Sequence, residues 1–259
     1  MARDVIITKK NELEIILDCE QHVLYELQNA FSFDVEGASF SPAYRKKFWD
    51  GKIRLLNMSK QTLPAGLTYQ LCKWCDRNDY SWDFKNNPYY GLPYEQDELI
   101  FSDGVELFMD KISNVKPREY QYDTVFHALK EYRKTIVSPT GSGKSLMIYA
   151  VVRYYAEKNK KILLVVPTTS LVEQMFKDFQ DYGWDAENYC HRIYAGKEKT
   201  NEYPVTITTW QSIYKLKRPF FKDFEVVIGD EAHLFKSKSL VSIMTKMDAA
   251  KYRFGFTGT

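Results

Sequence analysis

The 259-residue sequence is poor in the features that mark disulfide-rich, membrane-spanning or strongly charged proteins. It has four cysteines, too few for the disulfide framework of a small secreted domain. No apolar run approaches the ~20 residues that a membrane-spanning helix needs, and the first 20 residues scatter charges among apolar positions, unlike a signal peptide. The net charge is only +2, so bulk charge indicates no nucleic-acid partner. What remains is the composition of a soluble globular protein, which we expect in the cytoplasm.

Two cysteine motifs leave one metal site to be considered. Cys72 and Cys75 form a CxxC pair, and Cys19 and His22 form a CxxH pair. Together these four side chains could bind zinc in a tetrahedral site. The two pairs lie about 50 residues apart, have no knuckle glycines around them and fall in amphipathic helical patterns. We therefore interpret the cysteines as small buried apolar residues, with zinc as the alternative.

One glycine-rich stretch carries a specific binding chemistry. Residues 138–145 read SPTGSGKS, follow an apolar strand pattern at 135–137 and lead into a helical pattern at 144–157. Glycines allow a turn so tight that successive N–H groups surround anionic oxygens, and the helix adds the positive end of its dipole. Lys144 supplies a mobile charge for the β- and γ-phosphates, and the Ser145 hydroxyl is placed to bind Mg²⁺. The sequence therefore predicts a nucleoside triphosphate bound by these residues: Thr140, Gly141, Ser142, Gly143, Lys144 and Ser145.

A second strand pattern delivers two adjacent acids. An apolar run at 226–228 leads into the tetrad Asp230–His233. Asp230 can hold Mg²⁺, so that Ser145 and Asp230 are the predicted metal ligands, while Glu231 can deprotonate an attacking water as general base. Such a turn could be an ordinary acidic loop. Downstream of a phosphate loop, however, it predicts hydrolysis of the nucleotide.

The chain divides into two parts. Residues 114–259 alternate strand and helix patterns, which predicts a mostly parallel sheet covered by helices. The strand patterns lie at 135–137, 162–166, 205–208, 226–228 and 253–256, and the helical patterns at 119–132, 144–157, 169–182 and 239–248. Residues 1–113 predict a small α+β domain. Its patterns are strands at 4–8 and 12–17, a helix from 18, a hairpin turn at 50–51 followed by a strand at 52–56, a helix at 63–76 and an irregular passage at 80–93.

Charge is distributed unevenly between the two parts. Residues 1–113 carry 13 Lys/Arg against 18 Asp/Glu, and residues 114–259 carry 23 against 16. Within the acidic part, the stretch 45–60 is basic and is interleaved with aromatic residues such as Phe48 and Trp49. Cations bind phosphates and rings stack on bases, so this stretch predicts a nucleic-acid surface, the alternative being a solvated edge with its rings turned into the core. The candidate contacts are Arg45, Lys46, Lys47, Lys52 and Arg54.

Six short motifs, in this order, resemble those of superfamily 2 helicases. They are residues 118–121 (REYQ), 138–145 (SPTGSGKS), 166–174 (VPTTSLVEQ), 207–212 (ITTWQS), 230–233 (DEAH) and 256–259 (FTGT). Ser138 departs from the family pattern, which has Gly or Ala there, and still suits a tight turn. The resemblance covers residues 117–259 and implies an α/β fold, a RecA-like P-loop domain with a mostly parallel sheet, preceded by the small α+β domain.

The resemblance also implies roles for residues outside the phosphate loop. Lys144, Asp230, Glu231 and His233 would be catalytic, with His233 coupling hydrolysis to the last motif through Thr257 or Thr259. Arg118 and Gln121 would recognise adenine, so that the nucleotide is ATP, held with Mg²⁺. The residues that would contact the backbone of a bound nucleic-acid strand are Thr168, Thr169, Thr208, Thr209 and Trp210.

The whole chain, including the basic stretch, resembles the amino-terminal part of bacteriophage recombination helicases. This implies ATP-driven remodelling of branched DNA (forks, Holliday junctions and R-loops) in recombination and replication restart, within the cytoplasm of an infected bacterial host. Helicases of this superfamily need a second RecA-like domain that brings arginine fingers to the γ-phosphate, an effect of about 10³–10⁵ in rate. The chain stops directly after the last motif. We therefore expect the 259 residues alone to be a fragment that binds ATP weakly and is nearly inactive in hydrolysis.

Two other functions stay open from the sequence. One is a nucleic-acid-binding module whose nucleotide site serves only as a switch, although a switch has little need of a positioned base such as Glu231. The other is a different superfamily 2 enzyme, either an RNA helicase or a restriction motor subunit. The Ala-His pair at 232–233 differs from the Ala-Asp of most RNA unwinders, and no nuclease cluster is apparent in the sequence.

Overall fold

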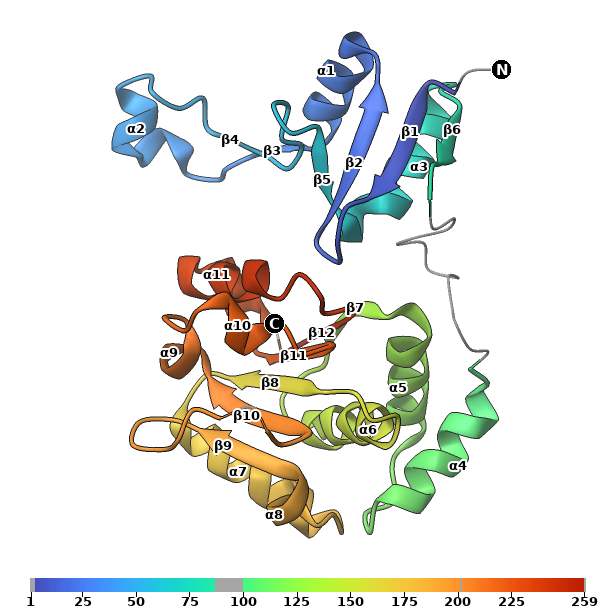
Figure 1. The fold of residues 1–259 in the computed structure, drawn as a ribbon, viewed down its shortest axis with the longest axis vertical. Helices are drawn as coiled ribbons and strands as arrows, with labels where there is room; N and C mark the ends of the chain where they lie inside the picture. Colours follow the sequence, from blue (N-terminus) through green and yellow to red (C-terminus); the bar gives the residue numbers. More distant parts are fainter. Residues whose placement is uncertain (1–2, 87–99, 201, 259) are drawn as a thin grey trace. The chain divides into compact units, whose positions relative to one another are not determined.

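The computed structural model describes residues 3–86, 100–200 and 202–258. They belong to two compact units, Met1–Glu95 and Gln96–Thr259 (Figure 1). Each unit has its own hydrophobic core, so each can be understood as a separate folding problem.

The division between the units lies earlier than the predicted boundary after residue 113. Helix α4 (Ser102–Ile112) belongs to the second unit, because it buries Val105 and Met109 in that unit's core. The hydroxyl of Tyr149 also donates a 2.7 Å hydrogen bond to the carbonyl oxygen of Ile112 at the end of this helix. The sequence of this helix alone does not indicate which of the two cores it covers.

The first unit is built on a four-stranded sheet of order β5-β2-β1-β6. Its strands are β1 (Val5–Lys9), β2 (Glu14–Cys19), β5 (Thr62–Pro64) and β6 (Trp82–Phe84). β2 pairs antiparallel with β1 and β5, whereas β6 runs parallel to β1. Alternate residues of β1 and β2 are buried, as expected for strands with one face on a core. The core is completed by two amphipathic helices, α1 (Gln21–Ala30) and α3 (Thr68–Arg77).

Residues 32–54 form an extension of the first unit that we call the arm. In the arm, β3 (Ser32–Asp34) pairs antiparallel with β4 (Lys52–Arg54). The chain between them forms a 3-10 helix, η1 (Ala38–Phe40), and the short helix α2 (Pro42–Arg45), which Figure 1 shows at the end of the arm. The predicted hairpin turn at 50–51 is therefore wrong, because the strand that pairs with β4 lies well before this turn in the sequence.

Two further predictions for the first unit need correction. The helix predicted at 63–76 begins at Thr68, because Thr62–Pro64 instead extends the sheet and buries Leu63 completely. The passage predicted to be irregular contains β6 at its start, and residues 87–93 of it lie outside the described residues. In both places the pairing partner is distant in sequence, so local pattern could not identify the strand.

The second unit contains a six-stranded sheet of order β7-β12-β11-β8-β10-β9 in which every pairing is parallel. The strands are β7 (Arg133–Val137), β8 (Ile162–Val166), β9 (Cys190–Ile193), β10 (Val205–Thr209), β11 (Val226–Asp230) and β12 (Tyr252–Thr257). The predicted parallel sheet is confirmed. β9 escaped prediction because its two central residues, His191 and Arg192, are polar, as an edge strand permits.

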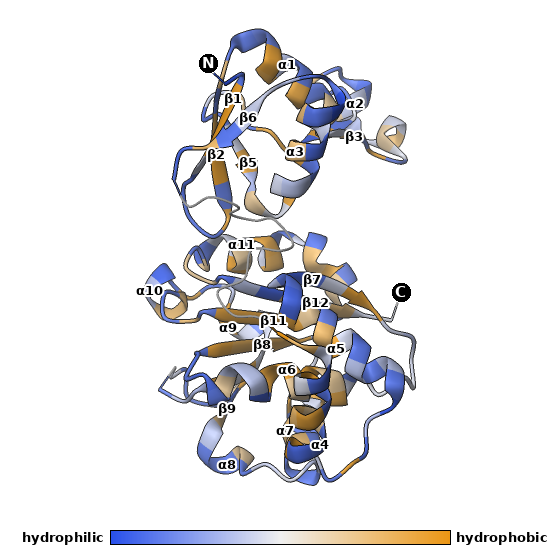
Figure 2. Cartoon of the chain, turned by 90° about the vertical axis from the view of Figure 1, so that its right-hand side faces the viewer, coloured by the Kyte–Doolittle hydropathy of each residue, from blue (hydrophilic) through white to orange (hydrophobic). Residues whose placement is uncertain are grey.

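Helices cover both faces of this sheet. α4, α5 (Glu119–Glu131), α6 (Lys144–Glu157) and α7 (Thr169–Asp181) contribute to one core cluster. The short helices α9 (Trp210–Ile213) and α10 (Arg218–Phe221), with α11 (Lys238–Lys246), contribute to the other. Leu164 faces the first cluster and Leu163 the second, which explains why β8 is apolar throughout; Figure 2 shows such apolar strands at the centre of the unit. No helix in the described part of the chain is long and apolar enough to cross a membrane.

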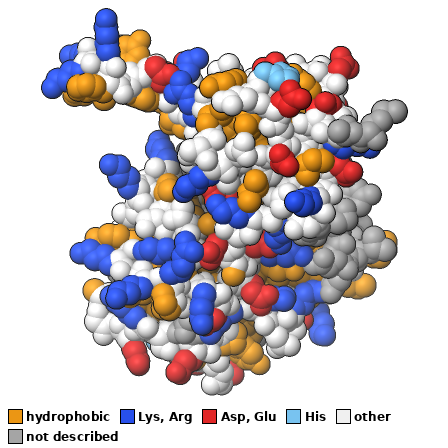
Figure 3. All heavy atoms as spheres, turned by 45° about the horizontal axis from the view of Figure 1, so that its top comes forward, with side chains coloured by type: hydrophobic (Ala, Val, Ile, Leu, Met, Phe, Trp, Pro, Cys, Tyr) orange, Lys and Arg blue, Asp and Glu red, His pale blue; other side chains and the backbone are white. Residues whose placement is uncertain are grey.

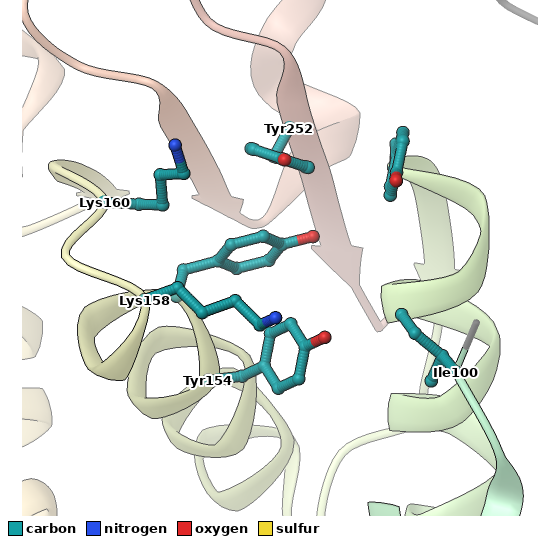
Figure 4. A pocket seen from close by; sticks show the side chains of 7 residues that line it. Ile100, Tyr154, Lys158, Lys160 and Tyr252 are labelled. Carbon is teal, nitrogen blue, oxygen red and sulfur yellow. The ribbon is translucent and has the colours of Figure 1, made fainter. Parts of the chain in front are cut away.

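Four tyrosines lie together at the edge of the sheet where its strands begin. A hollow of about 360 Å³ lies here. Figure 4 shows Tyr154, Lys158 and Tyr252 among the side chains that line it. Tyr155 and Tyr132 complete the aromatic lining. The Tyr155 hydroxyl is buried and has no hydrogen-bond partner among the described residues. Burial raises the pKa of this group well above its usual range.

Replacing Tyr155 with Phe is expected to leave the free energy of unfolding of the second unit unchanged or to raise it by about 1 kcal/mol. The reason is that a buried hydroxyl without a partner is a net cost, and its removal leaves the ring packing in place. The matched control is Tyr149→Phe, because the Tyr149 hydroxyl is bonded to Ile112 and also accepts a 2.8 Å hydrogen bond from Arg153. That change should destabilise by about 1–2 kcal/mol. Urea denaturation of both variants tests the comparison, which fails if Tyr155→Phe costs as much as Tyr149→Phe.

The cysteines of the first unit are packed as apolar side chains. Cys72 and Cys75 lie in its core, and burial raises the pKa of each thiol to about 12. Zinc binds the thiolate, which these surroundings disfavour. No group of three or more His, Cys, Asp or Glu side chains in the described ranges is arranged to hold a metal ion.

Candidate nucleotide site and nucleic-acid interface

Three neighbouring strands place the predicted catalytic groups at one edge of the second unit's sheet. β12 lies between β7 and β11. The phosphate loop follows β7, Asp230 is the last residue of β11, and Thr257 is the last residue of β12. Because all three strands are parallel, these ends meet at the same edge, which is where ligands bind in sheets of this kind.

The phosphate loop has the backbone that its glycines predict. Gly141 and Gly143 have φ angles of +81° and +72°, a region that favours glycine. A side chain at Gly143 would also overlap with the amide nitrogen of Gln121. The Ser138 N–H donates a 2.7 Å hydrogen bond to the carbonyl of Thr257, and the Ser138 hydroxyl bonds to that of Ser142 across the loop. The residue that departs from the family pattern therefore helps to close the loop.

Side chains at the start of α5 form hydrogen bonds to the backbone of the phosphate loop. Gln121 is almost fully buried: its Oε1 accepts a hydrogen bond from the Arg118 N–H (2.8 Å), and its Nε2 donates one to the Ser142 carbonyl (2.8 Å). The Tyr120 hydroxyl donates to the same carbonyl (2.7 Å) and lies 3.3 Å from Nη1 of Arg118. The structure therefore assigns Gln121 first to bracing the loop. Tyr120 is a loop contact that the sequence analysis missed, although it stands inside the 118–121 motif.

Lys144 connects the phosphate loop to the acidic motif. Its Nζ lies 2.7 Å from Oε1 of Glu231 and 3.1 Å from Oδ1 of Asp230. Partial burial alone would lower the pKa of Lys144, but the hydrogen bonds and charges of the two carboxylates outweigh it and raise the pKa. The ammonium group is thus fully charged at the centre of the site, between the loop that suits phosphates and the acid that suits a metal.

Glu231 is held in an unusual backbone conformation. Its φ of +54° lies in the left-handed region, which costs a non-glycine residue on the order of 1 kcal/mol. The Lys144 hydrogen bond is the main reason that its pKa is lowered, with contributions from the charge of Lys144 and from the Gly258 backbone. Glu231 is therefore an ionised carboxylate, able to accept a proton. Its carboxylate and that of Asp230 both contact the Lys144 ammonium, with Glu231 partly exposed and Asp230 nearly buried.

The predicted metal ligands fit a hard cation in chemistry. The Asp230 carboxylate is nearly buried, and Ser145 adds a hydroxyl; Mg²⁺ prefers oxygen donors of this kind. The hydrogen bond that Ser145 makes is with Tyr182, at 2.9 Å, rather than with Asp230. A hydrogen bond from Ser145 also acts on the Asp178 carboxylate, whose pKa is nonetheless raised by burial. Asp178 lies in the last turn of α7 and Tyr182 directly follows that helix, and no local pattern near Ser145 indicates either residue.

His233 contacts the end of β12, as the motif resemblance implies. Its Nδ1 lies 2.9 Å from the Thr257 hydroxyl, and the same nitrogen lies 3.4 Å from Oε2 of Glu231. His233 therefore connects Glu231, the candidate general base, to β12, the strand that lies between β7 and β11. Thr259, the other predicted contact, lies outside the described residues.

The predicted backbone contacts in the motifs at 166–174 and 207–212 differ in accessibility. Thr168 and Thr169 are exposed at the start of α7, where the Thr168 hydroxyl caps the helix by accepting from the Leu171 N–H. Thr208 is fully buried and donates its hydroxyl to the Ile193 carbonyl, while the nearly buried Thr209 bonds to Ser212. The partly buried Trp210 packs against the second core cluster. Thr208 is therefore a correction: its hydroxyl stabilises the sheet and is not available to a nucleic-acid strand.

The arm presents the basic residues predicted in the first unit. Arg45, Lys46, Lys47, Lys52 and Arg54 are all exposed. Arg54 forms an ion pair with Asp50, and Nζ of Lys52 lies 3.9 Å from Oδ1 of Asp34. Figure 3 shows Lys and Arg side chains together with hydrophobic ones on the arm. The alternative that the aromatic residues turn into the core is wrong for Phe48, which is 85% exposed.

A parallel sheet with a phosphate loop after one strand, an acidic pair after another and a coupled histidine defines the nucleotide-binding domain of a P-loop motor. Comparison with known proteins agrees. Residues 114–259 match the family described as "Type III restriction enzyme, res subunit", and residues 4–85 match "DNA helicase UvsW, N-terminal". The chain belongs to this family of superfamily 2 motors, and within it to the UvsW-like helicases.

Individual relatives give the same result. The chain is 36% identical over 256 residues to the ATP-dependent DNA helicase uvsW of Enterobacteria phage T4, covering 94% of this chain and 49% of that protein. A crystal structure of the UvsW helicase from bacteriophage T4 superimposes with a TM-score of 0.86 at 33% identity, covering 99% of this chain and 92% of that one. The DNA 3'-5' translocase XPB2 of Sulfurisphaera tokodaii is 32% identical over 164 residues, which is 63% of this chain and 35% of that protein. The chain thus spans half or less of the length of these two curated relatives.

Proposed function

We propose that this chain provides the ATP-binding part of a DNA helicase or translocase that remodels branched DNA, including forks, Holliday junctions and R-loops, in recombination and replication restart. The observation that carries the proposal is the bridge from Lys144 to Asp230 and Glu231, which joins a phosphate loop to a base at one sheet edge. The 36% identity to a phage ATP-dependent DNA helicase supports the choice of DNA as the partner.

The residues divide the work at the nucleotide. Loop N–H groups and Lys144 would hold the phosphates. Arg118, which contacts the Tyr120 hydroxyl beside the loop, would contact the base. Bound Mg²⁺ would neutralise charge on the phosphates, and Ser145 and Asp230 are the oxygens that would hold it. Glu231 would accept the proton of the attacking water. His233 contacts both Glu231 and Thr257, so it would relay changes at Glu231 during hydrolysis to Thr257 and thereby to β12.

Hydrolysis by these 259 residues alone is proposed to be slow. An arginine finger contributes about 10³–10⁵ in rate where one is used, and the superfamily takes it from a second motor domain. The groups proposed to bind ATP, the phosphate loop and Arg118, all belong to this chain, so binding and turnover should separate in it. Rapid turnover by the 259 residues with DNA would contradict the proposal.

A restriction-type motor is the second candidate, because the family model that matches residues 114–259 carries that description. The two functions differ in the DNA that they engage. A motor for branched DNA should bind a forked substrate more tightly, whereas a restriction motor should bind linear duplex equally well. Fluorescence anisotropy with forked DNA, linear duplex and RNA, in the presence of a non-hydrolysable ATP analogue, separates them.

The arm cations give a specific test of the DNA interface. A variant with Arg45, Lys46, Lys47 and Lys52 changed to Ala is expected to bind forked DNA roughly 10²-fold more weakly at low salt. Its slope of log K against log [salt] should also be shallower by about 3–4, because each lost phosphate contact removes nearly one released counterion.

The matched control removes four exposed cations of the same unit that lie outside both the arm and the basic stretch at 45–60: Arg3, Lys73, Arg77 and Lys85. It changes the net charge equally, so it should show only a small, non-specific loss. If the two variants lose affinity and slope equally, the arm is an ordinary charged surface and the interface lies elsewhere.

A further inference from the structure

The arm exposes large apolar side chains that contribute nothing to a core. Phe48 is 85% exposed, Phe40 76%, Phe33 55% and Ile53 51%. Neither η1 nor α2 contains a buried residue, and all three residues of β4 are exposed. Burying a phenylalanine side chain is worth about 2–3 kcal/mol, so these rings forgo a stabilisation that a folded domain normally uses. Single exposed apolar residues are ordinary, but several on one small extension mark an interaction site.

The arm is nonetheless held in shape by polar and backbone contacts. The Val35 N–H donates to the Gly51 carbonyl at 2.8 Å, and Trp49 Nε1 donates to the Lys52 carbonyl at 2.8 Å. The ring of Tyr44 lies so close to Gly51 that a side chain there would meet it at 3.0 Å. The pairing of β3 with β4 and the ion pair between Arg54 and Asp50 also hold the arm in shape. The exposed rings are therefore presented by an ordered backbone and not needed to maintain it.

The backbone that follows α2 leaves the Phe48 ring in solvent, directly after Lys46 and Lys47 in the sequence. Lys47 has a φ of +58°, which ends the helix, and the Phe48 N–H donates back to the Ala43 carbonyl at 2.9 Å. Lys46 and Lys47 precede the ring directly, and Arg45 is fixed by a 3.1 Å bond from its Nε to the Ser39 carbonyl. Because cations and an exposed ring are neighbours in this segment, a partner for the surface should offer both negative charge and flat apolar faces. Nucleic acid does so, through its phosphates and the faces of its bases.

We propose that Phe40 and Phe48 stack on base faces exposed at a branch point of DNA, while Arg45, Lys46 and Lys47 hold the adjoining phosphates. This rests on the proposed function, in which DNA is the partner, and adds how a branch is distinguished from plain duplex. In the interior of a duplex every base face is covered by its neighbours. Uncovered faces occur at forks, gaps and junctions, so stacking favours those structures, whereas the phosphate contacts bind any DNA. The rings set specificity and the cations set affinity.

The test compares forked DNA with relaxed circular duplex, using the whole chain and a 2-aminopurine base at the fork. The parent should quench the 2-aminopurine and prefer the fork. The Phe40→Ala/Phe48→Ala variant should lose the quenching and about 10-fold or more of its fork affinity, while duplex affinity and salt slope stay unchanged. Phe48→Trp should retain both signals, because it keeps a stacking ring, and Phe48→Leu should lose them. Phe101→Ala, which removes a 67% exposed ring outside the arm, is the matched control and should behave as the parent does.

The outcomes separate the two levels of the proposal. If the parent binds fork and circle equally, the proposed branched-DNA function fails at that point. If the parent prefers the fork and the double variant keeps the preference and the quenching, stacking by these rings is overturned. In that case the apolar surface serves another macromolecule, such as a protein partner.

Discussion

Glu231→Gln is expected to lower the rate of ATP hydrolysis by about 10²–10⁴-fold while ATP binding persists. Glutamine keeps the size and hydrogen-bonding capacity of the side chain but cannot accept a proton, so the loss falls on the chemical step. Lys144 still has Asp230 as a partner, so the phosphate loop should keep its shape. The measurement is single-turnover hydrolysis in a chain extended to the length of its relatives, beside the binding of a fluorescent ATP analogue.

The matched control is Glu225→Gln. Glu225 directly precedes β11 and pairs with Lys160 at 2.8 Å, at the opposite end of the strand from the site. This change should leave hydrolysis within about twofold of the parent. Unchanged hydrolysis in Glu231→Gln would exclude Glu231 as the general base and favour the reading of the site as a nucleotide switch.

Lys144→Ala should weaken ATP binding by about 10²-fold, because the phosphates lose a charged partner in a partly buried site. The change also leaves the nearly buried Asp230 carboxylate without the cation beside it, so unfolding should become easier by about 1–3 kcal/mol. Without the Lys144 hydrogen bond, the pKa of Glu231 should rise back toward its ordinary value. Calorimetric titration with ATP and Mg²⁺, together with thermal unfolding, measures both effects.

Lys134→Ala provides the comparison for this second prediction. Lys134 is a half-buried lysine of β7 paired with Glu131, at the far end of the strand from the phosphate loop. Its removal should leave ATP affinity unchanged. Retention of parent-like ATP affinity by Lys144→Ala would contradict the assignment of the loop.

The backbone of the phosphate loop could be predicted from the sequence because its geometry is local. A glycine loop needs its neighbours at fixed spacing, and Gly141 and Gly143 have the backbone angles that the pattern requires. The parallel sheet was predictable for a similar reason, since fully apolar runs such as β8 are typical of strands buried on both faces. The ends of such strands could then be assigned to one edge without knowing the strand order.

What the sequence could not predict depends on contacts between distant segments. The left-handed conformation of Glu231 arises from the turn that carries it toward Lys144, 87 residues away in sequence. The bond from Ser145 to Tyr182 joins two helices, and the burial of Thr208 follows from the edge strand β9, which no apolar run announced. Pairing of β4 with β3 likewise overturned a turn signal that was valid only locally. Each of these features can be identified only from the tertiary structure, and a stronger local sequence pattern would not have revealed it.

The most direct test of the whole account is the rate of ATP hydrolysis with and without forked DNA. It should be measured in a chain that carries the second motor domain implied by the family, with linear duplex and RNA as comparisons. We expect forked DNA to raise the rate above that with either alternative. A rate that is the same with and without DNA would contradict the claim that this site drives movement on nucleic acid.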